Sequence, residues 1–429
     1  MLQKNCRIYR NCLNIMKNFD KNFNLNQSKT FCMFPFTGFR NLHGYFSPCP
    51  IFWRNETFFS DKNKIDGKAV DTFLNSEDMK ALRKDMLNNT CSDRIKDVCR
   101  ICKEHNSKSM SCLRNAANDF MAPFYDEVIK NLNDDYSLKN TDVLFSSFTN
   151  NNICNFKCRM CDKERSSSFL TNKDKKLNKF LNPNVLIRKE IYDTNFDIFR
   201  TSKFIYFGYS GEPFITPDHL YILNKLKREN LTDKTIIYHT NCSYMSTEIL
   251  NTLEAFKQIR ILASIDGTGD FHKIIRPSKI KWSTIEANIE KMISLKNLDF
   301  SIYASVGVLN AFHIVDMYNH FVGKNYIKAN NFVINPIYNF LTAGNLQQEV
   351  KLELLEYYKK NIIDRITPNK EQLNFHKNTI VEEFMRFSEF IKIQPSQDLN
   401  LFKKEMLSLY SEHKRFFIKN YNYLLKAIL

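Results

Sequence analysis

Short apolar segments alternate with amphipathic ones through the middle of the chain. Six segments are apolar over most of their length and rich in β-branched or aromatic residues, which is typical of buried parallel strands; they are residues 142–149, 203–209, 234–240, 259–266, 300–308 and 331–336. Four intervening segments have apolar residues at three-to-four spacing, which predicts helices at 218–230, 246–258, 283–295 and 311–323. The predicted helix N-caps are Thr216, Ser246 and Ser283.

This alternation predicts an α/β fold. Strand–helix units in series connect by right-handed crossovers and build a parallel sheet. Six units are fewer than a closed eight-fold barrel needs, so we expect an open, partial (β/α)6 barrel over residues 140–340, with ligands at the carboxyl ends of its strands. Residues 1–139 lack the alternation and carry eight of the twelve cysteines, and residues 341–429 form a lysine- and phenylalanine-rich helical region. We therefore expect three parts.

Composition narrows the class of protein only slightly. The net charge is +16, but the excess of 62 Lys+Arg over 46 Asp+Glu is spread along the chain, which does not favour nucleic acid as a partner. No run of about 18 apolar residues predicts a membrane span, and the N-terminus lacks the apolar centre of a signal peptide. A cytoplasmic protein is expected, and there twelve cysteines indicate metal binding rather than disulfides.

Three cysteines, Cys154, Cys158 and Cys161, lie close together just after the first predicted strand. Thiolates suit zinc or iron–sulfur clusters. A structural zinc site takes four ligands, and catalytic zinc usually has a histidine ligand, which is not found nearby. Three thiolates on a four-iron cubane would instead leave one iron open for a ligand.

The loop "CNFKCRMC" resembles the cluster-binding signature of the radical S-adenosylmethionine (SAM) enzymes. Three further motifs are similar to those of the family, in the same order along the barrel. They are "YFGYSGEPFITP" (206–217) with its Gly-Glu-Pro, "HTNCS" (239–243), and "ASIDGTGDFHKIIRPSKIKWSTIEANI" (263–289) with Ser-x-Asp-Gly followed by an arginine. The resemblance covers about residues 140–340.

The resemblance implies a role for each residue of these motifs. Cys154, Cys158 and Cys161 would ligate three irons of a [4Fe–4S] cluster, and SAM would bind the fourth iron. Backbone carbonyls of Gly211 and Glu212 would accept from the SAM ammonium. Asn241 and Ser264 would hydrogen-bond the ribose or the methionine portion. Arg276 would pair with the SAM carboxylate, while Asp266 either joins the site or caps the loop that it precedes.

The implied activity is reductive cleavage of SAM to a 5'-deoxyadenosyl radical, which abstracts hydrogen from a peptide or a small polar substrate. An electron donor such as flavodoxin or ferredoxin would supply the electron. Two alternatives stay open. One is an enzyme of the same family that modifies nucleotides or sugars. The other is a non-catalytic protein that binds the cluster and SAM and has a structural zinc site near its N-terminus.

Two cysteine pairs near the N-terminus form a second candidate site. Cys32 and Cys49 flank a glycine, and Cys99 and Cys102 follow about fifty residues later. Four thiolates can hold zinc or a [4Fe–4S] cluster. The first pair resembles the auxiliary-cluster extensions called SPASM and twitch domains, which usually follow the barrel rather than precede it. We expect a second [4Fe–4S] cluster of the twitch type, with zinc or no metal as alternatives; Cys91 or Cys112 could replace one ligand, and Cys6, Cys12 and Cys242 are expected to be free thiols.

Overall fold

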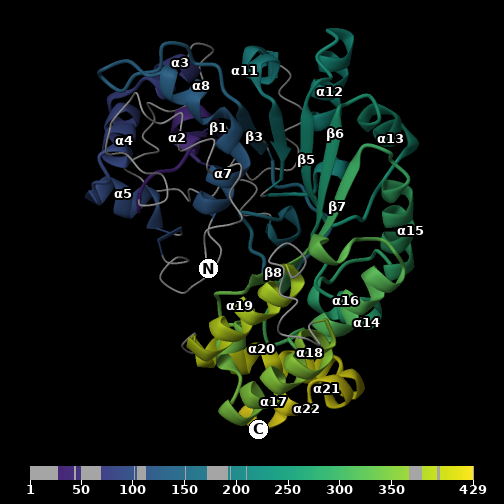
Figure 1. Cartoon of the computed structure of the whole chain (residues 1–429). Helices are drawn as coiled ribbons and strands as arrows, with labels where there is room; N and C mark the ends of the chain where they lie inside the picture. The colour runs from purple at the N-terminus through teal and green to yellow at the C-terminus, as the bar shows by residue number, and fades with distance from the viewer. Residues whose placement is uncertain are drawn as a thin grey trace. The chain divides into compact units, whose positions relative to one another are not determined.

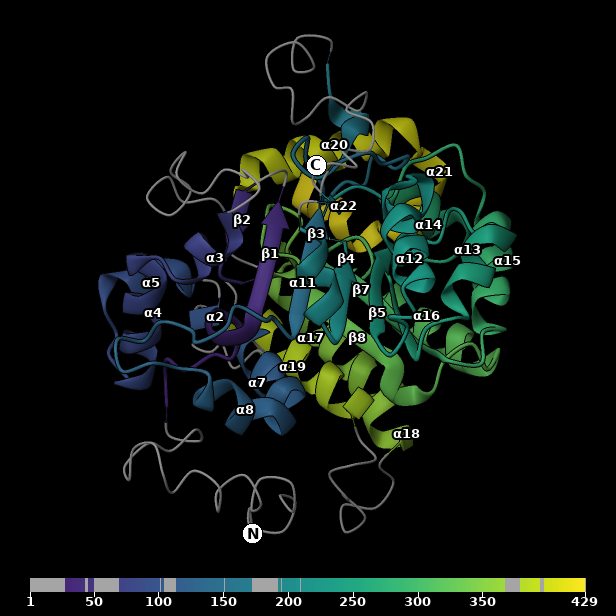
Figure 2. The same cartoon turned by 90° about the horizontal axis from the view of Figure 1, so that it is seen from above.

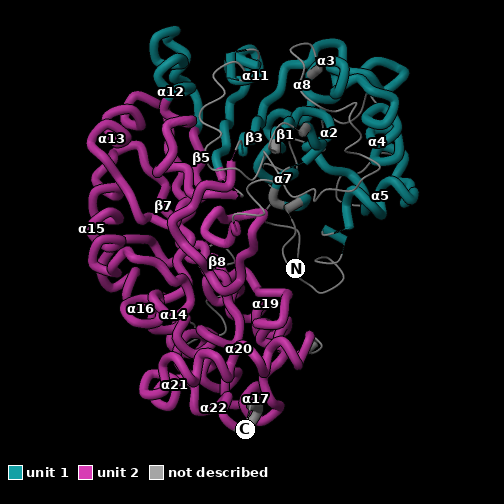
Figure 3. The backbone as a smooth tube through the Cα atoms, turned by 180° about the vertical axis from the view of Figure 1, so that it is seen from behind, with its two compact units in different colours: residues 1–150, 185–207, 221–235 teal, residues 151–184, 208–220, 236–429 magenta. Residues whose placement is uncertain are grey.

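The computed structural model places most of the chain in two compact units (Figure 3). Unit 1 comprises residues 1–150, 185–207 and 221–235, and unit 2 comprises residues 151–184, 208–220 and 236–429. The bounds of these two units differ from those of the three parts expected from the sequence. The division into three parts stays a prediction. The structure describes residues 28–42, 45–49, 69–100, 102–103, 113–149, 151–171, 192–193, 195–208, 210–366, 379–393 and 397–428.

Unit 1 contains a sheet with the strand order β2-β1-β3-β4. The predicted strands at 142–149 and 203–209 are confirmed as β3 and β4, which pair in parallel. β1 was not predicted: it pairs in parallel with β3 from Gly38↔Phe145 to Leu42↔Thr149, and it is antiparallel to β2. The bounds are β1 Gly38–Leu42, β2 Tyr45–Ser47, β3 Phe145–Thr149 and β4 Phe204–Phe207.

Helices of unit 1 precede, link and follow these strands, and an aromatic core joins some of them to the sheet. Phe73 on α3 contacts Phe46 on β2, and Phe199 on α11 contacts Phe148 on β3, with ring centroids 5.7 and 4.1 Å apart. The helices are α2 Phe34–Thr37, α3 Ala69–Leu74, α4 Glu77–Leu87, α5 Asp93–Val98, α7 Leu113–Met121, α8 Tyr125–Lys130 and α11 Phe196–Thr201.

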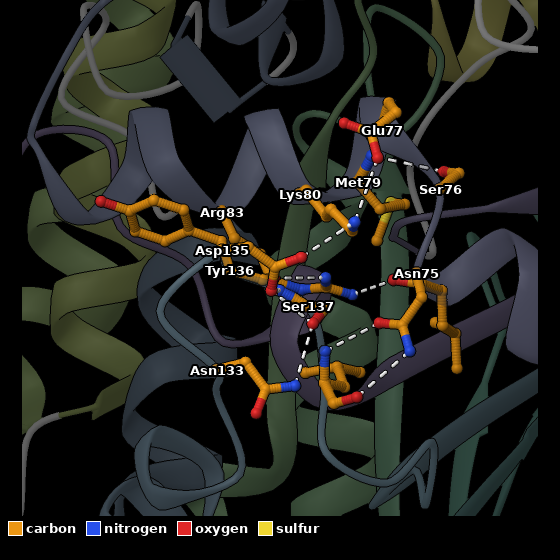
Figure 4. A network of polar contacts seen from close by, with 12 residues as sticks. Asn75, Ser76, Glu77, Met79, Lys80, Arg83, Asn133, Asp135, Tyr136 and Ser137 are labelled. Carbon is orange, nitrogen blue, oxygen red and sulfur yellow. Dashed lines mark hydrogen bonds and ion pairs between the residues drawn. The ribbon is translucent and has the colours of Figure 1, made fainter.

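A polar network around the fully buried Arg83 on α4 ties three segments of unit 1 together (Figure 4). Its guanidinium donates to the carbonyl oxygens of Pro35 at 2.8 Å, Tyr136 at 2.9 Å, and Leu74. Burial lowers the pKa of Arg83 to about 10. One cation therefore satisfies backbone acceptors in the first turn of α2, at the end of α3 and in the turn after α8.

Unit 2 contains the strands β5-β6-β7-β8 in that order. The β6–β7 and β7–β8 pairs are parallel. In Figures 1 and 2 the helices α13, α15 and α16 lie on one side of these strands. The bounds are β5 Thr235–Thr240, β6 Gln258–Ala263, β7 Leu298–Val306, β8 Phe332–Pro336, α13 Thr247–Leu253, α14 Gly269–Ile275, α15 Trp282–Ile293 and α16 His313–Gly323; α12 (Asp218–Arg228) has residues in both units. The predicted α/β class with parallel strands is confirmed.

Two of the three predicted N-caps are wrong. Ser246 does cap α13, because its hydroxyl accepts from the backbone N–H of Ile249 at 3.2 Å. Helix α15 begins at Trp282 with Lys281 as its N-cap, so Ser283 lies inside the first turn of the helix. Helix α12 begins at Asp218, and the Thr216 hydroxyl instead donates to the Pro213 carbonyl at 3.2 Å.

The region predicted to be helical after residue 340 is helical where it is described. The stretch expected at 401–429 divides into α20, α21 and α22, and that at 349–366 contains a π-helical turn at Lys359–Ile363. The bounds are α17 Gln348–Tyr358, α18 Asp364–Ile366, α19 Thr379–Ile393, α20 Leu399–Glu412, α21 Lys414–Asn420 and α22 Asn422–Ile428. Among the described helices, none has the length and apolar character needed to cross a membrane.

Candidate functional site

The loop with Cys154, Cys158 and Cys161 lies in unit 2 and is fixed at both flanks of Cys158. The backbone N–H of Lys157 donates to the Pro277 carbonyl at 2.9 Å, and that of Arg159 donates to the Ile275 carbonyl at 3.0 Å. The N–H of Cys161 closes a turn onto the Cys158 carbonyl at 3.0 Å. Cys158 is buried, and the other two cysteines are half-buried.

Serines that follow the cysteines hold the start of the loop. The Ser166 hydroxyl donates to the Phe156 carbonyl at 2.7 Å, and the Ser168 hydroxyl donates to the Cys154 carbonyl at 2.8 Å. The backbone N–H of Cys154 donates in turn to the Ser167 hydroxyl at 3.1 Å. Sequence analysis overlooked these serines, although their position directly after the cysteines was a usable signal.

Burial controls the protonation of the three thiols. It raises the pKa of Cys158 to about 12 and that of Cys161 to about 11, and it raises the pKa of Cys154 as well. Without metal the thiols are therefore neutral at pH 7. Because thiolates are the metal-ligating form, metal uptake here must release protons.

The Gly-Glu-Pro turn is tied to the same loop by its backbone. The N–H of Gly211 donates to the Arg165 carbonyl at 2.8 Å, and the N–H of Glu212 donates to the Ile153 carbonyl at 2.7 Å. Gly211 has φ +73°, and a Cβ there would lie 2.7 Å from the Ile153 oxygen. Only glycine fits this position without a clash and backbone strain.

The Glu212 side chain joins this turn to the end of β5. Its carboxylate is 2% exposed and accepts from the Phe214 N–H at 3.1 Å, the Thr240 hydroxyl at 2.7 Å and the Asn241 N–H at 2.6 Å. Burial raises the pKa of Glu212 to about 7, against the opposing effect of these donors. The Glu212 carbonyl, a predicted SAM contact, accepts a long hydrogen bond from the Ile215 N–H at 3.3 Å. A carbonyl oxygen has two lone pairs and can accept from a second donor.

Asn241 and Ser264 follow β5 and β6, as predicted. The Asn241 amide donates to Asn155 Oδ1 at 3.1 Å, and its amide oxygen accepts from the Ser243 N–H at 2.9 Å. Ser264 is half-buried, and its N–H donates to the Thr240 carbonyl at 2.7 Å. Asn241 is therefore held against the cysteine loop through Asn155, a neighbour of Cys154 that sequence analysis did not single out.

Arg276, at the C-terminal end of α14, forms a buried ion pair with Asp266. The Nε–Oδ2 distance is 2.6 Å, and Nη1 of Arg276 lies 3.7 Å from Cys158 Sγ. The two roles predicted for Asp266, in the site or as a cap of the loop that it precedes, stay predictions. Its carboxylate pairs with Arg276, and its other oxygen accepts from the Ser305 N–H at 2.7 Å. All the residues predicted to bind the cluster and SAM thus lie in one unit, connected through these contacts.

The four N-terminal cysteines lie in unit 1. Cys32 is buried just before α2, Cys49 follows β2, and Cys99 ends α5. Burial raises the pKa of Cys32, and the charges of the Cys99 and Cys49 thiolates raise it further. Among the described residues no three His, Cys, Asp or Glu side chains are grouped to hold a metal ion, so a site formed by these cysteines stays a prediction. Cys112, Cys6 and Cys12 lie outside the described residues.

Comparison with protein families identifies the domain around the cysteine loop. The model of the radical SAM superfamily matches residues 151–311. This part of the chain is therefore similar to the radical SAM superfamily. The match contains all three loop cysteines, the Gly-Glu-Pro turn, Asn241, Ser264 and Arg276.

Solved structures similar to the chain include two with bound SAM, at low sequence identity. A structure described as native anSMEcpe with bound AdoMet is 16% identical with a TM-score of 0.39, over 61% of this chain and 64% of that one. SuiB of Streptococcus suis bound to S-adenosylmethionine is 13% identical with a TM-score of 0.36, over 67% and 62%. The chain thus spans less than two thirds of either protein, and scores this low carry no argument about function. No curated protein matches the chain.

The donor set of the radical SAM domain fits a [4Fe–4S] cluster. Three cysteines on one loop offer thiolates alone, and N–H groups point at their sulfurs, such as that of Phe156 at 3.5 Å from Cys154 Sγ. A single zinc ion needs each thiolate sulfur about 2.3 Å away, whereas in a cubane each of the three thiolates would ligate a different iron.

Proposed function

We propose that the chain is an enzyme that binds a [4Fe–4S] cluster through Cys154, Cys158 and Cys161 and cleaves SAM reductively. One observation carries this proposal. The buried Cys158 lies in a loop whose backbone is fixed to the end of α14, the Gly-Glu-Pro turn and, through Asn155, to Asn241. Such fixation is what a cluster loop needs, because ligand positions must be held within small tolerances.

When bound, the cluster supplies the electron that cleaves SAM and so generates the 5'-deoxyadenosyl radical. The protein's own residues bind and orient SAM. The carbonyls of Gly211 and Glu212 accept from its ammonium group, and Asn241 and Ser264 contact its ribose or methionine portion. Arg276 keeps terminal N–H groups for the SAM carboxylate beyond those used by Asp266 and Cys158.

We propose a peptide or a small polar molecule as the substrate, with flavodoxin or ferredoxin as the electron donor. This part rests on the sequence resemblance to radical SAM enzymes with auxiliary-cluster segments.

The test is anaerobic incubation of the reconstituted protein with SAM and a strong reductant. We expect brown protein that forms 5'-deoxyadenosine and methionine, measured by liquid chromatography with mass spectrometry. A protein that takes up the cluster and binds SAM but forms no 5'-deoxyadenosine would instead be the non-catalytic binding protein considered above.

We further propose that Cys32, Cys49, Cys99 and Cys102 bind a second [4Fe–4S] cluster without an open iron. The two cysteine pairs in the sequence support it, since four thiolates can hold a [4Fe–4S] cluster. Four thiolates saturate a cubane, so this cluster would relay electrons or brace unit 1 rather than bind SAM.

Metal analysis tests the second cluster. In a variant with Cys154, Cys158 and Cys161 all replaced by alanine, we expect about four irons per chain, and adding Cys32→Ala should remove them. Zinc at about one per chain with negligible iron would identify a structural zinc site instead. Absence of both metals would show that the four cysteines do not form a site.

A further inference from the structure

Asp266 holds Arg276 in one orientation. The Asp266 side chain is completely buried, and the Arg276 side chain is 10% exposed. Besides Arg276, the carboxylate binds the Ser305 N–H at 2.7 Å, and the Asn310 amide donates to the Asp266 carbonyl at 2.8 Å. The carboxylate and the backbone of Asp266 are therefore both anchored, and the guanidinium is fixed with them.

The other end of the fixed guanidinium faces the sulfur of Cys158. Nη1 lies 3.7 Å from Sγ, within reach of an N–H···S hydrogen bond because sulfur is a large acceptor. Cys158 is 8% exposed, so little water screens this contact. The donors to the Cys154 sulfur are neutral groups, among them the Phe156 N–H at 3.5 Å and the Asn241 amide at 3.9 Å.

We propose that Arg276, positioned by Asp266, raises the reduction potential of the cluster bound by Cys158. This inference rests on the proposed function, since it requires a [4Fe–4S] cluster in the loop. One electron from a one-electron reductant takes the cluster from the 2+ to the 1+ state, which adds one negative charge next to Arg276. A fixed cation stabilises the more negative state, and hydrogen bonds to the sulfurs and the outer-shell partners of the ligands tune cluster potentials.

This role is separable from SAM binding, because the potential can be measured without SAM. Arg276 is here a positioning and tuning residue that acts through the Cys158 sulfur. A purely structural role would change stability or cluster content but not the potential of the clusters that remain.

The experiment is a redox titration of the full-length, reconstituted protein without SAM, followed by EPR of the reduced cluster. The EPR signal of the loop cluster is identified as the one that is absent from the variant lacking Cys154, Cys158 and Cys161. For Arg276→Gln we expect at least a tenfold lower ratio of reduced to oxidised cluster at a fixed potential, a shift of about 59 mV for one electron. Arg276→Lys keeps the charge but loses the planar fork and should lie between this variant and the wild type.

Arg260→Gln is the matched control. Arg260 lies near the amino end of β6, the opposite end from Ser264, and its Nε also pairs with an aspartate, Asp299, at 2.9 Å. For Arg260→Gln we expect the ratio of reduced to oxidised cluster at the same potential to stay within twofold of the wild-type ratio. Equal potentials for Arg276→Gln and Arg260→Gln would overturn the inference.

The remaining outcomes are also decisive. If Arg276→Gln holds no cluster, Arg276→Lys decides by the same measurement, and a wild-type potential there overturns the inference. A shifted potential in a protein that never forms 5'-deoxyadenosine would support the inference while the proposed function fails. If the wild type takes up no cluster in this loop, both fail.

Discussion

Replacing Cys158 by alanine should abolish SAM cleavage. Cys158 is the most enclosed thiol of the loop, and its flanking residues are fixed to Ile275 and Pro277, so no neighbouring sulfur can take its place. Two thiolates would remain for a cluster that needs three from the protein. We expect no 5'-deoxyadenosine above background and loss of about four irons per chain.

Cys242→Ala is the matched control for this experiment. Cys242 is a buried thiol of the same unit, and its φ of +58° is equally unfavourable for cysteine and alanine. The Cys242→Ala variant should keep both its iron and its SAM-cleaving activity. Formation of 5'-deoxyadenosine by Cys158→Ala at the wild-type rate would show that the loop is not the cluster site.

Replacing Arg83 by alanine should destabilise unit 1 severely. The change leaves the carbonyls of Pro35, Leu74 and Tyr136 buried without their donor. Each buried acceptor that loses its partner costs about 1–3 kcal/mol, so the total should be at least about 3 kcal/mol. Hydrogen–deuterium exchange, with faster exchange through α4 and the segments that Arg83 joins, would measure the effect locally.

Arg94→Ala provides the comparison on the next helix. Arg94 is about one third exposed and pairs with Asp85 at 3.3 Å and Asp78 at 3.8 Å. Pairs of this kind are worth about 0–1 kcal/mol. If Arg83→Ala and Arg94→Ala show the same rates of hydrogen–deuterium exchange, Arg83 does not stabilise unit 1 more than a surface ion pair does.

Strong periodicity made the central strands and helices predictable from the sequence. All six predicted strands and all four predicted helices between them are present, because apolar alternation is a local property that burial on both faces preserves. β1 escaped prediction because its sequence, GFRNL, combines glycine, arginine and asparagine. Its parallel pairing with β3, a hundred residues later, is a tertiary contact that propensity does not encode.

The candidate site could be located from motifs, but its internal contacts could not. The Gly-Glu-Pro motif places Glu212 at the site and suggests backbone contacts with SAM. It does not reveal that the carboxylate binds the end of β5. Likewise, the spacing between Asp266 and Arg276 gives no sign that they pair, because the intervening helix α14 decides where the arginine lies.

The interleaving of the two units has a practical consequence for making fragments of this protein. The chain returns to unit 1 at residues 185–207 and 221–235 after it has entered unit 2. A fragment that starts at residue 140 would keep β3 and β4 but lose β1, so β3 would expose an unpaired edge. Such edges promote aggregation. Expression of a fragment that starts at residue 140 should therefore yield insoluble protein, and studies of either unit are better done by point substitution in the full-length chain.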